Sequence, residues 1–385
     1  MESNATERRW VHGLKKAIKA LLLESFPVSE APNCHYSKSE IGRTLLEAIA
    51  HREYLSPYTT AARAHGRPLP DGDTIGYRLN DLTLADAGRI TEEALGKLRH
   101  SALDHGLIEP GFTAALDPTW EPVYTKRDPT ARGTNEFQGT KLGHEIITLQ
   151  AVKSKHLLPL AVRPWLPLDS GPILARALLS EVQKDVPIGL LLADREFYTV
   201  QYLKLFLESV PAYVVPLPEN KRNKREIIRA RQISIQVEGR PETVYIDSDF
   251  IVGSPPDSVR TTVVYVFRPD EARKRPGKTD RPEHFVFATS GPVTLRQALE
   301  RMDEYEYRWG IEVGNREQDR IGGKTRAERP ALQWLFFLLS VILYGIWVFG
   351  RFVWVPPRNI LRWELTTFMF RNLLGRCTRW KTGLG

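Results

Sequence analysis

The chain lacks the features that mark secreted proteins and cysteine-based metal proteins. Only Cys34 and Cys377 are cysteines among 385 residues, and two thiols so far apart exclude a disulfide framework and a cysteine-based zinc site. Residues 1–20 are charged and contain no apolar segment of the kind found in a cleavable signal peptide. These absences predict a protein of the reducing cytoplasm.

Long hydrophobic runs are also scarce, and the conspicuous one covers residues 331–355. Its only charge is Arg351, and about 20 apolar residues are enough to cross a bilayer. The run is solitary, arginines flank it at Arg326, Arg329 and Arg358, and its bulky aromatic residues also suit a buried helix. A membrane anchor therefore stays open as an alternative, while a helix of the protein core is favoured.

The length and the charge balance set the remaining limits. A chain of 385 residues exceeds one typical domain, so we expect two or three units, and 42% hydrophobic residues are enough to build a sizeable core. The net charge of +8 and the pI near 9.4 make a polyanion a plausible partner. That partner is either nucleic acid or an acidic membrane surface.

The first 108 residues predict an all-α region. Residues 8–25 form a basic amphipathic pattern, and Ser37 with Glu40 has the spacing of a capping box at the start of a second helix. A longer helix is expected at about 82–105.

Between these helices, two short helical segments are joined by the Gly/Pro turn GRPLPDGD. They begin at Ser56, followed by Pro57, and at Asp73. This is the pattern of a helix-turn-helix whose second helix would present Tyr77 and Arg78 to a DNA groove. An ordinary helical subdomain explains the same pattern equally well.

From about residue 110 the pattern changes to alternating strands and helices. Strands are expected at 112–117, 143–152, 157–163, 187–193 and 212–216, and helices at 172–184 and 198–209. Three early strands, a helix and then alternating strands and helices predict an α/β fold with a mixed sheet flanked by helices.

The last third of the chain begins with an expected all-β insertion at residues 218–291. It carries two basic stretches, which solvated loops and DNA contacts explain equally well. Residues 294–320 predict helix, and a basic tail at 356–385 carries aromatic residues that either pack or contact DNA.

Three carboxylates stand out in this arrangement: Asp117, Asp194 and Glu312. The first two each follow a short apolar strand, and the third lies on a helical stripe. Acids from separate elements can hold two Mg²⁺ ions about 3.5–4 Å apart, the arrangement that in-line attack on a phosphodiester requires. Acids after strands are also common as caps and turn residues, so spacing alone leaves both interpretations open.

Three motifs around these acids resemble those of a known family. The segments ALDPTW at 115–120 and DREFY at 194–198 resemble the two aspartate motifs of insertion-sequence transposases. Tyr305, Arg308 and Glu312 match the Tyr-x2-Arg-x3-Glu-x6-Lys signature of insertion-sequence family four and its relatives. The signature lysine is replaced by Asp319, and the candidates for its role are Lys324, Arg320 and Arg316.

The resemblance covers roughly residues 110–350 and implies a ribonuclease-H-like catalytic core. It places Asp117 on the first strand, Asp194 after the fourth strand and Glu312 on a helix after the insertion, as catalytic residues and ligands of Mg²⁺ or Mn²⁺. The implied units are a helical DNA-binding region at 1–108, the core at 109–217 and 292–355, a β-rich insertion at 218–291 and the tail at 356–385. In such a core the apolar run packs against the sheet.

The resemblance also implies the activity and the partners. It describes a DDE transposase that binds the inverted-repeat ends of its own insertion sequence, cleaves DNA with Mg²⁺ and transfers the strand to target DNA. We expect a homodimer in the synaptic complex, a nucleoid-associated protein of the cytoplasm and no membrane partner. The DNA-binding candidates are Tyr305, Arg308, Arg316, Arg195, Arg78 and Tyr77. Tyr305, Arg308, Glu312 and Arg316 would form one stripe on a single helix.

Alternatives remain at both levels. Other acids near the motifs, which we expect to be surface or turn residues, are Glu196, Asp247, Asp249 and Glu317. The competing functions are a non-catalytic DNA-binding protein derived from a transposase, a protein anchored in a membrane by 331–355, and a nuclease without strand transfer.

Overall fold

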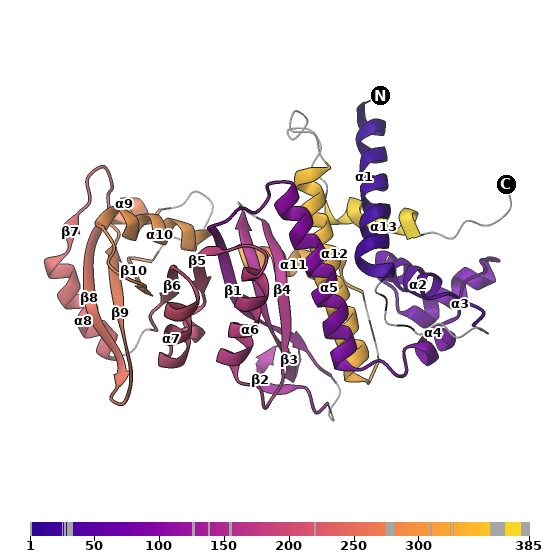
Figure 1. Cartoon of the computed structure of the whole chain (residues 1–385), viewed down its shortest axis with the longest axis horizontal. Coiled ribbons are helices and arrows are strands. Elements are labelled where there is room, and N and C mark those ends of the chain that lie inside the picture. Colours follow the sequence, from indigo (N-terminus) through magenta and orange to yellow (C-terminus); the bar gives the residue numbers. More distant parts are fainter. Residues whose placement is uncertain are drawn as a thin grey trace.

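The structure is a computed structural model that describes most of the chain. The described residues are 2–24, 26, 28, 34–124, 128–137, 139–153, 156–218, 221–274, 282–308, 310–323, 325, 327–354 and 366–378. The molecule is elongated, with a helical region at one end and a β-rich region at the other (Figure 1).

The N-terminal region is helical, as expected. Its helices are α1 (Glu2–Ile18), continued by a π-helical turn (Lys19–Leu23), α2 (Lys38–His51), α3 (Leu55–Ala64), α4 (Gly72–Arg78) and α5 (Leu84–Asp104). The capping box is confirmed, because the Ser37 side chain accepts from the Glu40 amide while the Glu40 side chain accepts from the Ser37 amide.

Two predicted helix starts in this region were wrong by one or two residues. Helix α3 begins at Leu55 rather than at Ser56. Helix α4 is capped by Asp71, whose carboxylate accepts from the Thr74 amide at 2.6 Å, and not by Asp73. Asp71 lies three residues before the amide it caps, which is the spacing that lets a short side chain reach back to the first turn.

The described strands form one ten-stranded mixed sheet. The strands are β1 (Phe112–Pro122), β2 (Arg132–Phe137), β3 (Thr140–Lys153), β4 (His156–Trp165), β5 (Ile188–Ala193), β6 (Ala212–Pro216), β7 (Ile235–Gln236), β8 (Thr243–Ser254), β9 (Asp257–Phe267) and β10 (His284–Thr289). Their order is β2-β3-β1-β5-β6-β10-β9-β8-β7, with β4 also paired to β3. Strands β1, β5 and β6 are parallel and β3 is antiparallel to β1. The expected mixed α/β architecture is therefore confirmed.

The expected insertion extends this sheet instead of forming a sheet of its own. Strand β10 pairs with β6 and continues through β9 and β8 to β7. The prediction that it is all-β was wrong, because the basic stretch forms helix α8 (Lys221–Ile233) and a short helix α9 (Asp270–Arg273) follows β9. In α8, Ala230 is buried and Ile227 packs against the core, which gives this highly charged segment an apolar side.

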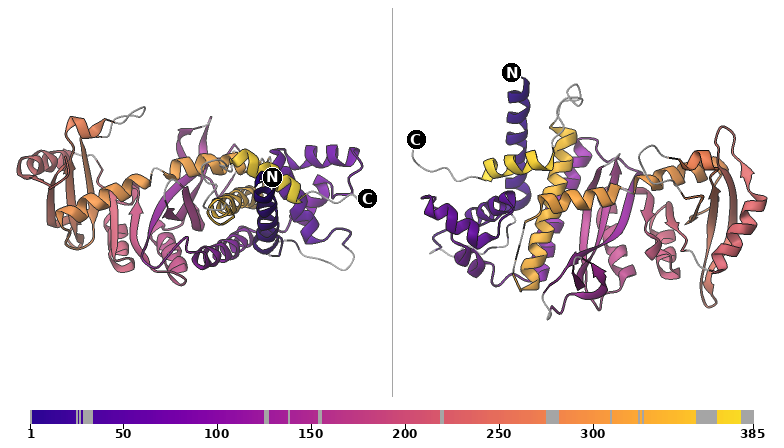
Figure 2. Two further views of the ribbon diagram at one scale, coloured as in Figure 1. Left: turned by 90° about the horizontal axis from the view of Figure 1, so that it is seen from above. Right: turned by 180° about the vertical axis from the view of Figure 1, so that it is seen from behind.

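Side chains of the central strands alternate between two apolar cores, one on each face of the sheet. On β1, Ala114 and Leu116 belong to the larger core, which contains α6 (Gly171–Gln183) and α7 (Val200–Ser209), whereas Ala115 belongs to the smaller one. Leu190 and Leu192 of β5 join Ala115 in the smaller core, with residues of α10 (Leu295–Tyr307) and α11 (Gly310–Ile321). Seen from above, α10–α11 and α6–α7 lie on opposite sides of the sheet (Figure 2). The fully apolar run of β5 follows from this burial on both faces.

The apolar run forms α12 (Pro330–Val353), which lies beside α5 along the strand β4 (Figure 1). This helix is long and apolar enough to cross a membrane, but 89% of its most apolar window is buried within the protein. Trp334 and Trp347 are almost fully buried. The structure thus uses the segment as a core helix.

The described part of the C-terminal tail returns to the N-terminal region. Helix α13 (Thr367–Thr378) packs against α2 and α1, with Phe370 fully buried. Arg371 donates to the Ala50 carbonyl at 3.0 Å, and the Cys377 thiol lies 3.7 Å from the Val11 carbonyl. This segment of the basic tail packs, while residues 355–365 and 379–385 lie outside the described residues.

Candidate active site

Asp117 and Asp194 lie next to each other because of the register between two parallel strands. The last paired positions of β1 and β5 are Leu116 and Ala193, and each aspartate is the following residue. Both continue the alternation that places Ala115 and Leu192 toward α10 and α11. The prediction that Asp117 ends its strand was wrong, because β1 runs on to Pro122 paired with β3 alone.

A single guanidinium joins the two aspartates. Arg308 Nη1 lies 2.6 Å from an Asp117 oxygen, and Nη2 lies 2.7 Å from an Asp194 oxygen. All three side chains are largely buried, with 17%, 12% and 25% of their area exposed for Arg308, Asp117 and Asp194. Asp194 also accepts from the Glu196 amide at 3.2 Å and so caps the 3-10 turn Arg195–Phe197.

Arg308 reaches this position because the helix is broken there. Helix α10 ends at Tyr307 with Arg308 as its C-cap, and α11 begins at Gly310. The single helical stripe expected through Tyr305, Arg308, Glu312 and Arg316 was therefore wrong. The two helices follow one another along the sheet (Figure 2), and from the C-cap of α10 the Arg308 side chain reaches both Asp117 and Asp194.

The remaining members of the signature have different surroundings. Tyr305 is buried, and the Arg308 guanidinium lies over its ring at 5.3 Å from the centroid. Arg316 is exposed on α11. Position 312 belongs to α11, but the side chain of Glu312 lies outside the described part of the chain.

The aspartate pair carries more negative charge than the single guanidinium balances. Burial raises the pKa of Asp117 to about 7, with a further increase from the Asp194 charge, although the Arg308 charge opposes this rise. Burial acts to lower the pKa of Arg308, but the neighbouring Tyr305 and the two aspartates outweigh it and raise that pKa. Two carboxylates that share one buried cation leave negative charge insufficiently compensated.

The residues present suit a divalent ion. Carboxylate oxygens are the hard ligands that Mg²⁺ prefers, and Asp117 and Asp194 already converge on one cation, the guanidinium. Among the described residues, no group of three His, Cys, Asp or Glu side chains could hold a metal, and Glu312 is not among them. Of the three expected ligands, the described side chains are therefore those of Asp117 and Asp194.

Other predicted site residues lie elsewhere. Arg195 is exposed in the turn after Asp194. Tyr77 is 79% exposed on α4, whereas Arg78 donates to the Tyr36 carbonyl at 3.3 Å. Helix α4 lies in the helical end of the molecule, beyond α5 and α12 as seen from the strand β1 (Figure 1), so Tyr77 and Arg78 do not join the aspartates.

The other acids also separate into near and distant ones. Glu196 is exposed, and its charge helps to raise the pKa of Asp117. Asp247 and Asp249 lie on β8 in the insertion, where Asp249 pairs with Arg260 at 3.3 Å. Glu317 pairs with Arg320 at 2.6 Å on α11.

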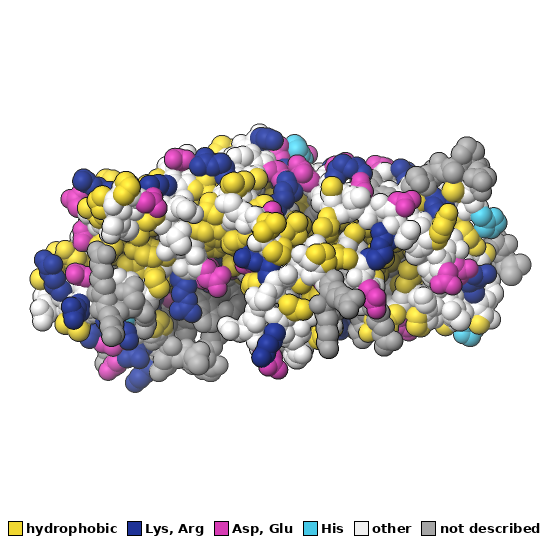
Figure 3. Space-filling model, turned by 90° about the horizontal axis from the view of Figure 1, so that it is seen from below, with side chains coloured by type: hydrophobic (Ala, Val, Ile, Leu, Met, Phe, Trp, Pro, Cys, Tyr) yellow, Lys and Arg dark blue, Asp and Glu magenta, His cyan; other side chains and the backbone are white. Residues whose placement is uncertain are grey.

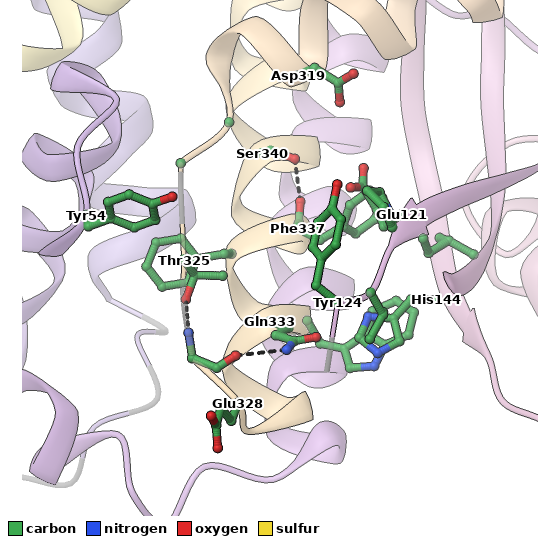
Figure 4. A pocket seen from close by; sticks show the side chains of 18 residues that line it. Tyr54, Glu121, Tyr124, His144, Asp319, Thr325, Glu328, Gln333, Phe337 and Ser340 are labelled. Atoms are coloured by element: carbon green, nitrogen blue, oxygen red, sulfur yellow. Dashed lines mark hydrogen bonds between the residues drawn. The ribbon is translucent and has the colours of Figure 1, made fainter. Parts of the chain in front are cut away.

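A cavity of about 700 Å³ is lined by the end of β1, by β3, by Asp319 of α11 and by α12 (Figure 4), and Asp117, Asp194 and Arg308 do not line it. A neighbouring cavity of about 480 Å³ shares Glu121 and Asp319 with it. Burial raises the pKa of Glu121 to about 8, with a smaller contribution from the charge of Asp319. Burial raises the pKa of Asp319 as well.

Asp319, which stands at the position of the signature lysine, lines this cavity together with Glu121 and Glu328. Of the proposed replacements, Arg320 pairs with Glu317. Lys324 lies outside the described residues. Sequence reasoning did not identify Glu121, because the strand expected at 112–117 stops four residues before it, whereas β1 continues to Pro122.

The comparisons with known proteins agree with the fold. No protein-family model and no curated protein matches the sequence. A cryo-EM structure of the piggyBac transposase synaptic complex with hairpin DNA is similar, with a TM-score of 0.51 and 14% identity, over 97% of this chain and 77% of that chain. At this identity the likeness concerns the fold. The chain therefore has a mixed sheet flanked by helices that is similar to the ribonuclease-H-like fold of a DDE-type transposase.

Proposed function

We propose that this protein is a DDE transposase of the prokaryotic insertion-sequence type, related to family four. In this proposal it binds the inverted-repeat ends of its own element, cleaves DNA and transfers the freed 3′ end to target DNA. The observation that carries the proposal is the convergence of Asp117 and Asp194 from adjacent parallel strands onto one buried cation. The transposase-like fold supports it.

Each residue of the site has a role in this proposal. Asp117, Asp194 and Glu312 hold the metal. Two Mg²⁺ ions, for which Mn²⁺ can substitute, supply an activated water and stabilise charge on the attacking and leaving oxygens when bound. Arg308 binds the phosphodiester through its two parallel donors, and the buried ring of Tyr305 supports the guanidinium from one side.

The DNA would extend from this site over basic surfaces on both sides. On α8 the exposed cations include Lys224, Arg225 and Arg229, and Figure 3 shows several Lys and Arg side chains at the insertion end of the molecule. We propose Arg195 and Arg316 as contacts near the site, and the helices carrying Tyr77 and Arg78 as the end-recognition region. Phosphate contacts of this kind make binding salt-dependent.

The unit boundaries expected from the sequence remain part of this proposal. The helical region at 1–108 would recognise the ends, the core at 109–217 and 292–355 would carry the chemistry, and the insertion at 218–291 would contact DNA. We further propose that two copies act together, since two ends must meet in synapsis, and that the protein works in the cytoplasm on the nucleoid.

The test is Mg²⁺-dependent cleavage of DNA taken from the flanks of the gene. Asp194→Asn should lower strand cleavage at least 10³-fold while leaving DNA binding unchanged, because it removes a metal ligand and keeps the shape. Asp249→Asn, an exposed acid of the insertion, is the matched control and should cleave normally.

Cleavage retained by Asp194→Asn would overturn the assignment of the site. A joining assay with pre-cleaved ends separates the transposase from a nuclease, since only strand transfer produces a joined product.

A further inference from the structure

Arg308 is the counter-ion of both aspartates. Among the described residues, no other side chain forms an ion pair with Asp117 or with Asp194. One nitrogen of the guanidinium serves each carboxylate, at 2.6 and 2.7 Å, so the group bridges the pair in the way that a shared metal ion would. A cation coordinated by both carboxylates would have to displace it.

The surroundings hold the guanidinium in this bridging position. Arg308 Nε is buried and has no hydrogen-bond partner, so the group is held through its two outer nitrogens and by the face of Tyr305. Asp117 and Asp194 are fixed by the ends of their strand pairing. The ion pair is therefore largely removed from water, where charge pairs interact more strongly than at a surface.

The backbone nevertheless allows Arg308 to leave. The residue is the C-cap of α10 and lies between two helices rather than within one, and 17% of its side chain is exposed to solvent. A phosphodiester offers the same two-oxygen geometry as the carboxylates, which suits bidentate binding by a guanidinium.

We propose that Arg308 is a built-in competitor of divalent metal, which binds Asp117 and Asp194 only when the guanidinium moves away. The inference rests on the proposed function, because it takes the two aspartates as metal ligands. DNA-free protein then binds metal weakly, and a phosphate that draws Arg308 off the aspartates favours metal loading. By thermodynamic linkage, bound metal favours phosphate binding by the same factor.

The test is Mn²⁺ binding to the DNA-free protein, followed by the electron paramagnetic resonance signal of free Mn²⁺. Arg308→Gln should bind Mn²⁺ at least tenfold more tightly than the wild type. The gain should vanish in the double variant Arg308→Gln/Asp194→Asn, since the site itself is then removed. Arg296→Gln removes the same charge from an exposed pair on α10 and should leave the affinity unchanged.

A second variant keeps the test valid if Arg308→Gln does not fold. Arg308→Lys keeps the charge but lacks the planar guanidinium that gives each carboxylate its own nitrogen, so it should bind Mn²⁺ more tightly than the wild type and less tightly than Arg308→Gln. Circular dichroism establishes which variants are folded. A folded variant at position 308 with unchanged or weaker Mn²⁺ affinity overturns the inference, as does a gain that survives Asp194→Asn.

These results are independent of the cleavage assay. Unchanged Mn²⁺ affinity together with Asp194-dependent cleavage would remove this inference and keep the proposed function. A gain in Mn²⁺ affinity without any DNA cleavage by the wild type would keep this inference and remove the proposed function.

Discussion

Glu121 makes the stability of this protein depend on pH in a direction that can be calculated. Its half-buried carboxyl lines the cavity together with Asp319, and removal from water raises its pKa from 4.5 to about 8. The folded state therefore binds the Glu121 proton more tightly than the unfolded state. The stabilisation from this proton is complete below pH 4.5 and is lost as the pH rises toward 8.

The size of the effect follows from the two pKa values. Between pH 6 and pH 8 the unfolded state has already lost the proton while the folded state still holds most of it. Each pH unit in this interval costs at most about 1.4 kcal/mol, and titration near pH 8 reduces the total to roughly 2 kcal/mol. Glu121→Gln is neutral throughout and should not show this loss.

The assay is urea denaturation of the wild type and the variant at pH 6, 7 and 8. The free energy of unfolding of the wild type, relative to Glu121→Gln, should fall by about 2 kcal/mol across the series. Glu136→Gln, at an exposed position of β2, is the control and should run parallel to the wild type. Asp319→Asn should retain most of the fall, because burial contributes more than the charge of Asp319.

Parallel curves for the wild type and Glu121→Gln would refute the reasoning. So would a difference that grows toward low pH, since it would mean that Glu121 is ionised and favourably paired in the folded state.

Two further predictions concern buried contacts of the helices. Arg67→Ala should lower the free energy of unfolding by about 3–5 kcal/mol, because it leaves Glu47, 1% exposed and paired at 2.7 Å, as a buried charge without its cation. Arg63→Ala, which breaks an exposed pair, should cost under about 1 kcal/mol, and equal losses in chemical denaturation would contradict the distinction. Gly350→Ala should lower the free energy of unfolding by about 1–3 kcal/mol, since its Cβ would lie 2.5 Å from ring atoms of Trp10 and Trp354. An unchanged midpoint of chemical denaturation would contradict this, because it would mean that both rings can move aside without cost.

The parts of the fold that depend on local pattern were predictable. The capping box of Ser37 and Glu40 uses residues three apart, and the apolar run of β5 is bounded by clear turn residues. Two aspartates that follow neighbouring strands converge whenever those strands are parallel and in register. That is why the pair Asp117 and Asp194 could be proposed before its register was known.

The parts that depend on distant contacts were not predictable. The segment around Arg308 has a continuous helical pattern, but α10 ends at Tyr307, next to ion pairs that Arg308 forms with residues 191 and 114 positions away in sequence. Strand β2 has the polar sequence RGTNEF, which carries no apolar alternation, and it exists because β3 offers a partner. The raised pKa of Glu121 depends on the packing of α11 and α12 beside the end of β1, and no short segment of the sequence predicts that packing.

The packing of α13 against α1 and α2 has a consequence for the order in which the protein folds. The contact between Cys377 and Val11 spans 366 positions, and the contact between Arg371 and Ala50 spans 321. During synthesis the sheet can assemble from segments already released, whereas the first helices must wait for α13. The packing of the first helices of this chain is thus completed only after the last helix, α13, has been synthesised.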